Sequence, residues 1–240
     1  MKRSDIIKVS SIQTLGTLDG PGIRFVVFLK GCPLRCMYCH NPETWADDEY
    51  QIYNVDDLVN MIMRYTPYFG KDGGVSVSGG EPLVQAAALI GLFKKLKNLN
   101  INIVLDTSGC LWNDDVSELL KYVDLCILDI KHTDKEEYFR LTKGNLCDTL
   151  YFLNMLEKRG IDTWIRQVIV NGLNDDVKQL SCLRELTQQY KCVKKVELLG
   201  FKNICKTKYE RLNILFPMGN IAETESKKVE QLQKKYFSNE

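Results

Sequence analysis

The chain has 240 residues, 45% hydrophobic and 26% charged, which is ordinary for a folded globular protein and excludes a disordered, collagen-like or coiled-coil chain. Its 32 basic and 31 acidic residues leave a net charge of +1, which argues against nucleic acid or an anionic membrane as a partner. The early apolar run at 25–29 is far shorter than the about 18 residues of a membrane span. Residues 1–11 lack the apolar stretch of a signal peptide, so we expect a cytoplasmic protein.

Short apolar or β-branched runs alternate with segments of helical period along the chain. The predicted strands are 23–30, 74–78, 101–106, 124–130, 163–170 and 193–199. The predicted helices are 54–66, 83–97, 114–122, 134–142, 148–159, 175–190 and 223–237. Asn113 and Asn174 stand where helix N-caps would lie. Strand followed by helix, repeated, predicts an α/β fold with a parallel sheet.

Polar residues follow the carboxyl ends of the first four predicted strands. They are Gly31-Cys32, Ser78-Gly79-Gly80-Glu81, Asp106-Thr107 and Asp129-Ile130-Lys131. Parallel sheets, whether doubly wound or closed into a barrel, place their chemistry at this edge. Helix caps account for some Asp and Ser residues at such positions. The recurrence of polar residues at the ends of four consecutive strands predicts one functional site.

The strongest local pattern is a group of three cysteines, Cys32, Cys36 and Cys39, in the loop after the first predicted strand. The chain has nine cysteines, and an odd number without a secretion signal argues against a disulfide framework. A structural zinc site needs a fourth ligand, and His40 directly follows Cys39 and is poorly placed to bind the same ion. A cubane 4Fe-4S cluster takes one thiolate per iron, so three cysteines would leave one iron open for chemistry.

The motifs around these cysteines resemble those of the radical S-adenosylmethionine superfamily. A Cys-x3-Cys-x2-Cys loop follows the first predicted strand, and Ser-Gly-Gly-Glu-Pro at 78–82 follows the second. Within this superfamily the chain resembles the glycyl-radical-enzyme activases over nearly its whole length. The matching segments are 19–24, 31–32, 38–42, 44–45, 105–107, 128–131 and 164–166.

The resemblance implies a partial (β/α)6 barrel of the TIM type, in which S-adenosylmethionine binds the open iron. One electron would split its sulfur–carbon bond, and the resulting 5'-deoxyadenosyl radical would remove a hydrogen atom from a glycine of a partner enzyme. A radical of this reactivity requires an enclosed site away from water. The resemblance favours pyruvate formate-lyase as the partner. The alternatives are another glycyl radical enzyme, or a single-cluster electron-transfer protein without radical chemistry.

The remaining six cysteines show no paired spacing, and at least five of them are predicted to pack in the core. They are Cys110, Cys126, Cys147, Cys182, Cys192 and Cys205. Some related activases carry an inserted segment with additional clusters, but no cysteine lies between Cys39 and Cys110, which predicts one cluster. We expect a single domain with an N-terminal extension at 1–22, a barrel core at 23–200 and a partner-facing segment at 201–240.

The resemblance assigns residues that bind S-adenosylmethionine. It assigns no catalytic residue beyond the cluster and the cofactor themselves. Those assigned to S-adenosylmethionine are Tyr38, Cys39, His40, Gly79, Gly80, Glu81, Asp129, Ile130, Lys131 and Arg166. Glycines let backbone approach a ligand closely. The alternative is a tight turn in which Glu81 merely opens the next helix. Asp19 is assigned to the partner's glycine loop, although an Asp in such a turn commonly caps a neighbouring amide.

The segment after the last predicted strand departs from the family, because Gly200-Phe201-Lys202 stands where these activases typically have Pro-Tyr-His. We expect Lys202 either to reach S-adenosylmethionine or to be a solvated surface lysine. Residues 43–57 contain six acids and no base, whereas 191–211 contain seven bases and two acids. The basic stretch is either a solvated face or attracts an acidic electron donor, reduced flavodoxin or ferredoxin. We expect the protein to act as a monomer.

Asp106 and Asp129 end the third and fourth predicted strands, so their carboxylates are expected to lie close together if these strands are neighbours. Two anions at a partly dry site repel each other unless a cation offsets the repulsion. Lys131 is one such cation. A bound K+ or Na+, with Thr107 as a further ligand, would complete the neutralisation, and the family resemblance implies the same. The alternative is that Asp106 caps a turn and Asp129 pairs only with Lys131.

Overall fold

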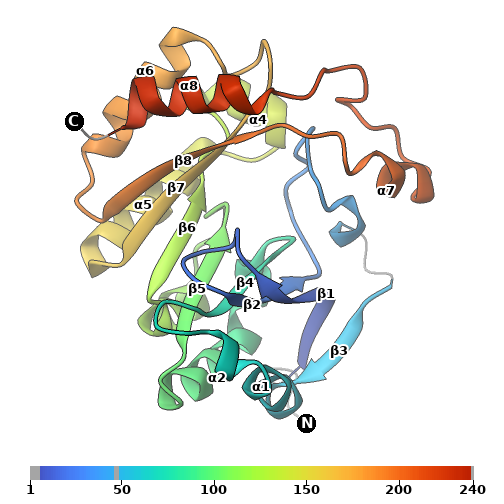
Figure 1. The fold of residues 1–240 in the computed structure, drawn as a ribbon, viewed down its shortest axis with the longest axis vertical. Helices are drawn as coiled ribbons and strands as arrows, with labels where there is room; N and C mark the ends of the chain where they lie inside the picture. Colours follow the sequence, from blue (N-terminus) through green and yellow to red (C-terminus); the bar gives the residue numbers. More distant parts are fainter. Residues whose placement is uncertain (1–5, 46–48, 239–240) are drawn as a thin grey trace. The chain divides into compact units, whose positions relative to one another are not determined.

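The computed structural model describes residues 6–45 and 49–238 and shows helices alternating with strands (Figure 1). The residues form two compact units. Unit 1 contains the described residues up to Pro33 together with Thr44–Ile127. Unit 2 contains Leu34–Glu43 together with the described residues from Leu128 onwards. The unit boundary therefore crosses the loop that contains Cys32, Cys36 and Cys39, which we call the cysteine loop.

In unit 1 the strands follow the hydrogen-bonded order β3-β1-β2-β4-β5. Their bounds are β1 Ile6–Gly16, β2 Arg24–Leu29, β3 Gln51–Asn54, β4 Gly74–Gly79 and β5 Asn102–Thr107. Strands β2, β4 and β5 are parallel, and Leu29 lies opposite Gly79 where β2 and β4 end. Strand β1 runs antiparallel to both β2 and β3. The parallel strands are nearly continuous buried runs, as expected when both faces of a sheet are covered.

The helices of unit 1 are α1 Val55–Met63, α2 Ala86–Asn98 and α3 Asp114–Leu119. Helix α2 contacts α1, α3 and β5. Its buried residues include Leu89, Leu92, Phe93 and Leu96, whose spacing forms the apolar stripe of an amphipathic helix. The predicted N-cap at Asn113 is confirmed, since its side chain accepts a hydrogen bond from the N–H of Val116 at 2.9 Å.

In unit 2 the strands follow the order β6-β7-β8, and β6 (Leu125–Asp129) carries the chain from unit 1 into unit 2. Strand β7 (Asp162–Ile169) is parallel to β8 (Val193–Gly200). The helices are α4 Lys135–Thr142, α5 Leu146–Arg159, α6 Val177–Gln188, α7 Lys206–Arg211 and α8 Ser226–Phe237. None of the helices within 6–45 and 49–238 has the length and apolar character needed to span a membrane.

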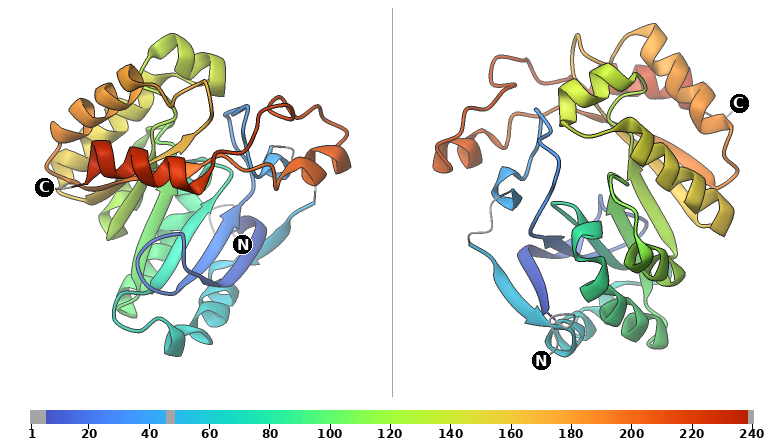
Figure 2. Two further views of the ribbon diagram at one scale, coloured as in Figure 1. Left: turned by 45° about the horizontal axis from the view of Figure 1, so that its top comes forward. Right: turned by 180° about the vertical axis from the view of Figure 1, so that it is seen from behind.

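Helix α8 packs against β8 and covers part of its edge (Figures 1 and 2). The side-chain amide of Gln233 accepts a hydrogen bond from the N–H of Leu198 and donates one to the carbonyl of Val196, both at 2.8 Å. These are the bonds that a neighbouring strand would make. Gln233 therefore protects strand β8 from pairing with another chain.

The predicted α/β class is confirmed, and each predicted strand and helix is present with its ends shifted by at most a few residues. The predicted parallel sheet is present, and β1 and β3, which were not predicted, add antiparallel pairings at its edge. Both strands were missed, since β1 buries few residues beyond Val9 and β3 is short and largely exposed. Helix α7 was also missed, because its sequence, KTKYER, is short and shows no apolar period. The single domain with an extension at 1–22 stays a prediction, and β1 occupies much of that extension.

The predicted N-cap at Asn174 was wrong. Helix α6 begins later, and the side chain of Asp176 caps it by accepting a hydrogen bond from the N–H of Gln179 at 3.0 Å. Asn174 is fully buried and instead bonds the preceding backbone, accepting from the N–H of Val170 and donating to the carbonyl of Val168, both at 2.8 Å. An Asn before a helix commonly bonds its own turn in this way.

Candidate active site

The second half of the cysteine loop, residues 34–43, is anchored on helix α4 of unit 2. The backbone N–H groups of Arg35 and Met37 donate to the carbonyls of Thr142 at 2.8 Å and Leu141 at 2.9 Å. These carbonyls lie at the C-terminal end of α4, where the helix has no further N–H groups to donate to them. The helix end therefore fixes the backbone on both sides of Cys36.

The thiols of this loop differ in burial. Cys36 is buried, whereas Cys32, in unit 1, and Cys39, in unit 2, are half-buried. Burial and the neighbouring Cys36 raise the pKa of Cys39 to about 12, although the N–H of Asn41 donates to its sulfur at 3.4 Å. Without a bound cation this thiol is protonated at neutral pH. A metal that binds it must displace the proton.

The donor set of the loop fits a 4Fe-4S cluster, which takes one thiolate per iron. The chain supplies three thiols within one loop, Cys32, Cys36 and Cys39, and directs a backbone N–H at one of the sulfurs. Among the residues that the structure describes, no group of three or more His, Cys, Asp and Glu side chains is arranged to hold a single metal ion. That these three cysteines hold the cluster stays a prediction.

Tyr38 lies between two of these cysteines and has a buried hydroxyl. Its side chain is 4% exposed, and within the described ranges the hydroxyl has no hydrogen-bond partner. Burial raises the pKa of Tyr38 far above its usual value, so the hydroxyl remains a donor. Buried polar groups without partners are uncommon. A polar ligand atom at this position would satisfy the hydroxyl, which fits the predicted cofactor contact.

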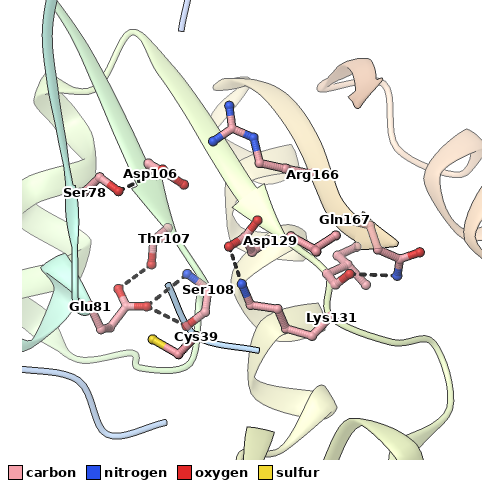
Figure 3. A network of polar contacts seen from close by, with 12 residues as sticks. Cys39, Ser78, Glu81, Asp106, Thr107, Ser108, Asp129, Lys131, Arg166 and Gln167 are labelled. Atoms are coloured by element: carbon pink, nitrogen blue, oxygen red, sulfur yellow. Dashed lines mark hydrogen bonds and ion pairs between the residues drawn. The ribbon is translucent and has the colours of Figure 1, made fainter. Parts of the chain in front are cut away.

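The carboxylate of Glu81 is fully engaged inside unit 1 (Figure 3). Its Oε1 accepts from the N–H of Leu83 at 3.1 Å and from the hydroxyl of Thr107. Its Oε2 accepts from the N–H of Ser108 at 2.9 Å and from the Ser108 hydroxyl. The sulfur of Cys110 lies 3.9 Å from Oε2. Glu81 therefore opens the next helix, which was the alternative to cofactor binding in the sequence analysis. It also holds residues 107–110 after β5.

Gly79 and Gly80 lie where the ends of β2 and β4 pack most closely. A Cβ at Gly79 would meet the backbone nitrogen of Leu29 at 2.1 Å, and Gly79 has a φ of +115°. A Cβ at Gly80 would meet the carbonyl oxygen of Gly31 at 2.2 Å. Close backbone packing thus accounts for both glycines without a ligand. Their contact with S-adenosylmethionine stays a prediction.

Asp129 and Lys131 form an ion pair at the end of β6 (Figure 3). Burial alone would lower the pKa of Lys131. The charge of Asp129, with smaller effects of Cys36 and Tyr38, outweighs burial and raises the pKa of Lys131 well above its ordinary value. Lys131 is therefore a mostly buried cation that faces the cysteine loop of unit 2. It is suited to bind an anionic group.

Ile130 and Arg166 are joined through their backbones. The N–H of Ile130 donates to the carbonyl of Arg166 at 3.0 Å, and the carbonyl of Ile130 accepts from the amide of Gln167 at 2.9 Å. The guanidinium of Arg166, which is largely buried, pairs with the carboxylate of Glu197 at 3.1 Å. These bonds fix the end of β6 against β7. The cofactor contacts of Ile130 and Arg166 stay predictions.

His40 contacts the backbone of Lys202 rather than its side chain. The Nε2 of His40 lies 3.0 Å from the carbonyl oxygen of Lys202, so this nitrogen carries the proton and donates. Burial lowers the pKa of His40, which makes the ring neutral at pH 7. The ammonium of Lys202 pairs with Glu223 at 3.3 Å, and both side chains are more than 40% exposed. This geometry favours the solvated-lysine alternative for Lys202.

Asp106 accepts a hydrogen bond from the hydroxyl of Ser78 at 2.9 Å across β4 and β5 (Figure 3). The hydroxyl of Thr107 donates to Glu81 and accepts from the N–H of Gly109 at 3.0 Å. Asp106 and Thr107 belong to unit 1 and Asp129 to unit 2. A cation shared by the three residues therefore stays a prediction.

Asp19 lies in a turn that a buried arginine holds in place. Arg24 is fully buried, and its Nε donates to the hydroxyl of Ser76 at 3.0 Å. That hydroxyl donates to the backbone carbonyl of Asp19 at 2.6 Å, while Arg24 also donates to the carbonyl of Pro21 at 3.3 Å. Burial lowers the pKa of Arg24 to about 10, so it stays charged at neutral pH. The contact of Asp19 with a partner stays a prediction.

Sequence reasoning missed Ser108, Lys208 and Tyr209. Ser108 donates two hydrogen bonds to Glu81. Lys208 donates to the side-chain oxygen of Asn41 at 2.8 Å, and the hydroxyl of Tyr209 donates to the carbonyl of Cys39 at 3.2 Å. The last two pairs are separated by 167 and 170 residues in the chain, so no local pattern signals them.

Known proteins resemble this chain in sequence and in fold. The model of the 4Fe-4S single cluster domain family matches residues 18–144. A curated relative from Staphylococcus epidermidis (strain ATCC 12228 / FDA PCI 1200), named pyruvate formate-lyase-activating enzyme, is 39% identical over 229 residues. The match covers 92% of this chain and 91% of the relative.

Solved structures share the fold at low sequence identity. A radical SAM methyltransferase from Sphaerobacter thermophilus matches with a TM-score of 0.64 and 14% identity, covering 88% of this chain and 62% of that chain. Streptococcus suis SuiB bound to S-adenosylmethionine matches with a TM-score of 0.61 and 17% identity, covering 72% of this chain and 39% of that chain. The predicted radical SAM fold is thereby confirmed. Because the curated relative matches at 39% identity over nearly the full length of both proteins, the chain belongs to the pyruvate formate-lyase-activating enzyme family.

Proposed function

We propose that this protein activates a glycyl radical enzyme by reductive cleavage of S-adenosylmethionine at a 4Fe-4S cluster. The observation that carries the proposal is the loop of Cys32, Cys36 and Cys39 in a chain of this family. Three thiolates for four irons leave one iron for a cofactor, whereas an electron carrier needs no open iron. When bound, the cluster and S-adenosylmethionine supply the homolysis of a sulfur–carbon bond, whose product abstracts a hydrogen atom from glycine.

The residues of the chain would bind, orient and shield these groups. Lys131, held as a cation by Asp129, would bind the carboxylate of S-adenosylmethionine. Tyr38 offers a buried hydroxyl donor. Glu81 keeps the backbone of residues 107–110 in one conformation through bonds to Thr107 and Ser108. Fixed side chains in a water-poor site reduce the entropy lost on reaching a reactive geometry.

The proposal is tested by anaerobic reconstitution with iron and sulfide, followed by S-adenosylmethionine and a chemical reductant. We expect release of 5'-deoxyadenosine and methionine, measured by chromatography. A protein that keeps its cluster and is reduced, yet releases neither product, would instead be a single-cluster electron-transfer protein.

The partner is a protein substrate, and we propose pyruvate formate-lyase, which the name of the relative indicates. Recording the glycyl radical signal by electron paramagnetic resonance after incubation with candidate enzymes would identify it. The basic stretch at 191–211 supports reduced flavodoxin or ferredoxin as the electron donor, with an association rate that falls as salt rises. We propose a cytoplasmic monomer, which size-exclusion chromatography with light scattering would check.

We further propose a K+ or Na+ site formed by Asp106, Thr107 and Asp129. A cation would offset the repulsion between the two carboxylates and the carboxylate of S-adenosylmethionine. Affinity for S-adenosylmethionine, measured by calorimetry in buffers that contain only tetramethylammonium, is expected to rise when K+ or Na+ is added. Replacing Asp106 with Asn should weaken this dependence, because one anion is removed.

The control for this prediction is Asp115→Asn, since Asp115 is exposed at the start of α3. It should respond to K+ and Na+ as the unaltered protein does. Equal affinity with and without both ions, together with an unchanged Asp106→Asn variant, would dismiss the cation site.

A further inference from the structure

The segment after β8 returns to the cysteine loop and bonds it at several points inside unit 2. The carbonyl of Lys202 accepts from His40 at 3.0 Å. The ammonium of Lys208 donates to the side-chain oxygens of Asn41 at 2.8 Å and Glu43 at 2.6 Å. The hydroxyl of Tyr209 donates to the backbone carbonyl of Cys39 at 3.2 Å. Consecutive residues of helix α7 thus hold the loop on both sides of His40.

The residue that makes the backbone contact is rigidly packed. Tyr209 is 1% exposed, and its ring lies 4.6 Å from that of Phe216, which in turn lies 6.3 Å from the ring of Phe201. Phe201 is fully buried at the end of β8. An aromatic cluster of this kind has few alternative arrangements. Tyr209 is therefore a fixed support for the carbonyl of Cys39.

Lys208 acts on the same cysteine through Asn41. The backbone N–H of Asn41 donates to the sulfur of Cys39 at 3.4 Å, while its side chain accepts from Lys208. Hydrogen bonds to cluster sulfurs and nearby positive charge both stabilise the more negative, reduced form of an iron–sulfur cluster. Lys208 supplies the charge and orients the residue that supplies the hydrogen bond.

We propose that Lys208 and Tyr209 are positioning residues that hold the backbone of residues 39–43 and thereby raise the reduction potential of the cluster. The inference rests on the proposed function only for the identity of the group bound to Cys39. The holding of the loop is a property of the protein without the cluster. The two parts are therefore measured separately.

The first measurement is hydrogen exchange of residues 39–43 in the cluster-free protein. In Lys208→Met and Tyr209→Phe these amides should exchange about tenfold faster than in the unaltered protein, which corresponds to the loss of one charge-assisted or buried hydrogen bond. Tyr209→Phe keeps the ring and its packing. Lys206→Met, an exposed position on the same helix, removes the same charge and should leave the exchange unchanged.

The second measurement is a redox titration of the reconstituted cluster with small-molecule mediators, followed by electron paramagnetic resonance. In Lys208→Met the ratio of reduced to oxidised cluster at a given potential should fall about tenfold, equivalent to about 59 mV for one electron. Lys208→Arg should restore most of the potential, because it keeps the charge and can donate to both oxygens. Lys206→Met should differ little from the unaltered protein.

Unchanged exchange in both Lys208→Met and Tyr209→Phe would overturn the holding of the loop. Faster exchange with an unchanged potential would overturn the effect on the cluster. An equal fall in potential in Lys206→Met and Lys208→Met would show that net charge, and not the contact with Asn41, sets the potential, and would also overturn it. A protein that binds no cluster at all fails the proposed function instead, and the exchange measurement still stands.

Discussion

Replacing any one of Cys32, Cys36 or Cys39 with Ala is expected to abolish retention of the cluster and all cleavage of S-adenosylmethionine. Each thiolate would be the sole protein ligand of one iron, so its loss leaves two irons without a protein ligand. Iron and sulfide content after anaerobic reconstitution, together with the visible absorption of the cluster, measures the effect. Air should inactivate the unaltered protein as well, because an iron without a thiolate ligand is open to oxidants.

The matched controls are Cys147→Ala and Cys182→Ala. Both cysteines are exposed on the helices of unit 2, so the prediction that at least five of the six remaining cysteines pack in the core was wrong. Both variants should bind the same amount of iron and sulfide as the unaltered protein. Loss of the cluster in Cys110→Ala with retention in Cys32→Ala would overturn the ligand assignment.

Replacing Glu81 with Gln is expected to lower the free energy of unfolding by about 2 kcal/mol or more. Each carboxylate oxygen of Glu81 accepts a backbone N–H, from Leu83 on one side and from Ser108 on the other. A Gln side chain presents an NH2 group, which only donates, at one of these positions. Either orientation of the amide therefore leaves one buried backbone N–H facing another donor.

The measurement for Glu81→Gln is denaturant-induced unfolding of the cluster-free protein, followed by circular dichroism. Glu118→Gln is the matched control, because the carboxylate of Glu118 accepts only from the side chains of Lys121 and Tyr122 among its observed bonds, and these can reorient. Little change is expected there. If Glu81→Gln is as stable as Glu118→Gln, the bonds of Glu81 do not stabilise residues 107–110.

Sequence by itself determined the alternation of strands and helices and the position of the cysteines. Parallel strands such as β2 and β4 are nearly continuous buried runs, and helix α2 shows an apolar stripe, so local period alone identifies them. Cysteines only a few residues apart, such as Cys36 and Cys39, are close wherever the loop lies. The spacing of the cysteines therefore predicted an iron–sulfur cluster. Together with the neighbouring motifs, it also indicated the family.

Edge strands and helix ends were harder to predict. Strand β1 has only a few buried residues, and its place beside β2 depends on an antiparallel pairing that hydrophobic period does not encode. Asn174 has the residue type of an N-cap, but burial directs its side chain into the turn that precedes α6, and Asp176 takes the cap. Local propensity was overruled at these positions by the contacts of the folded chain.

Only the tertiary structure decided which distant residues hold the site. Glu81 reads in the sequence as a helix opener, and the pairing of β4 with β5 places it against Thr107 and Ser108. Lys202 was expected either to reach the cofactor or to be a solvated surface lysine, and no contact of Lys208 or Tyr209 was predicted. The return of the chain after β8 brings Lys208 and Tyr209 to the cysteine loop. Hydrogen bonds between residues more than a hundred positions apart depend on how the elements pack, and no local pattern carries that information.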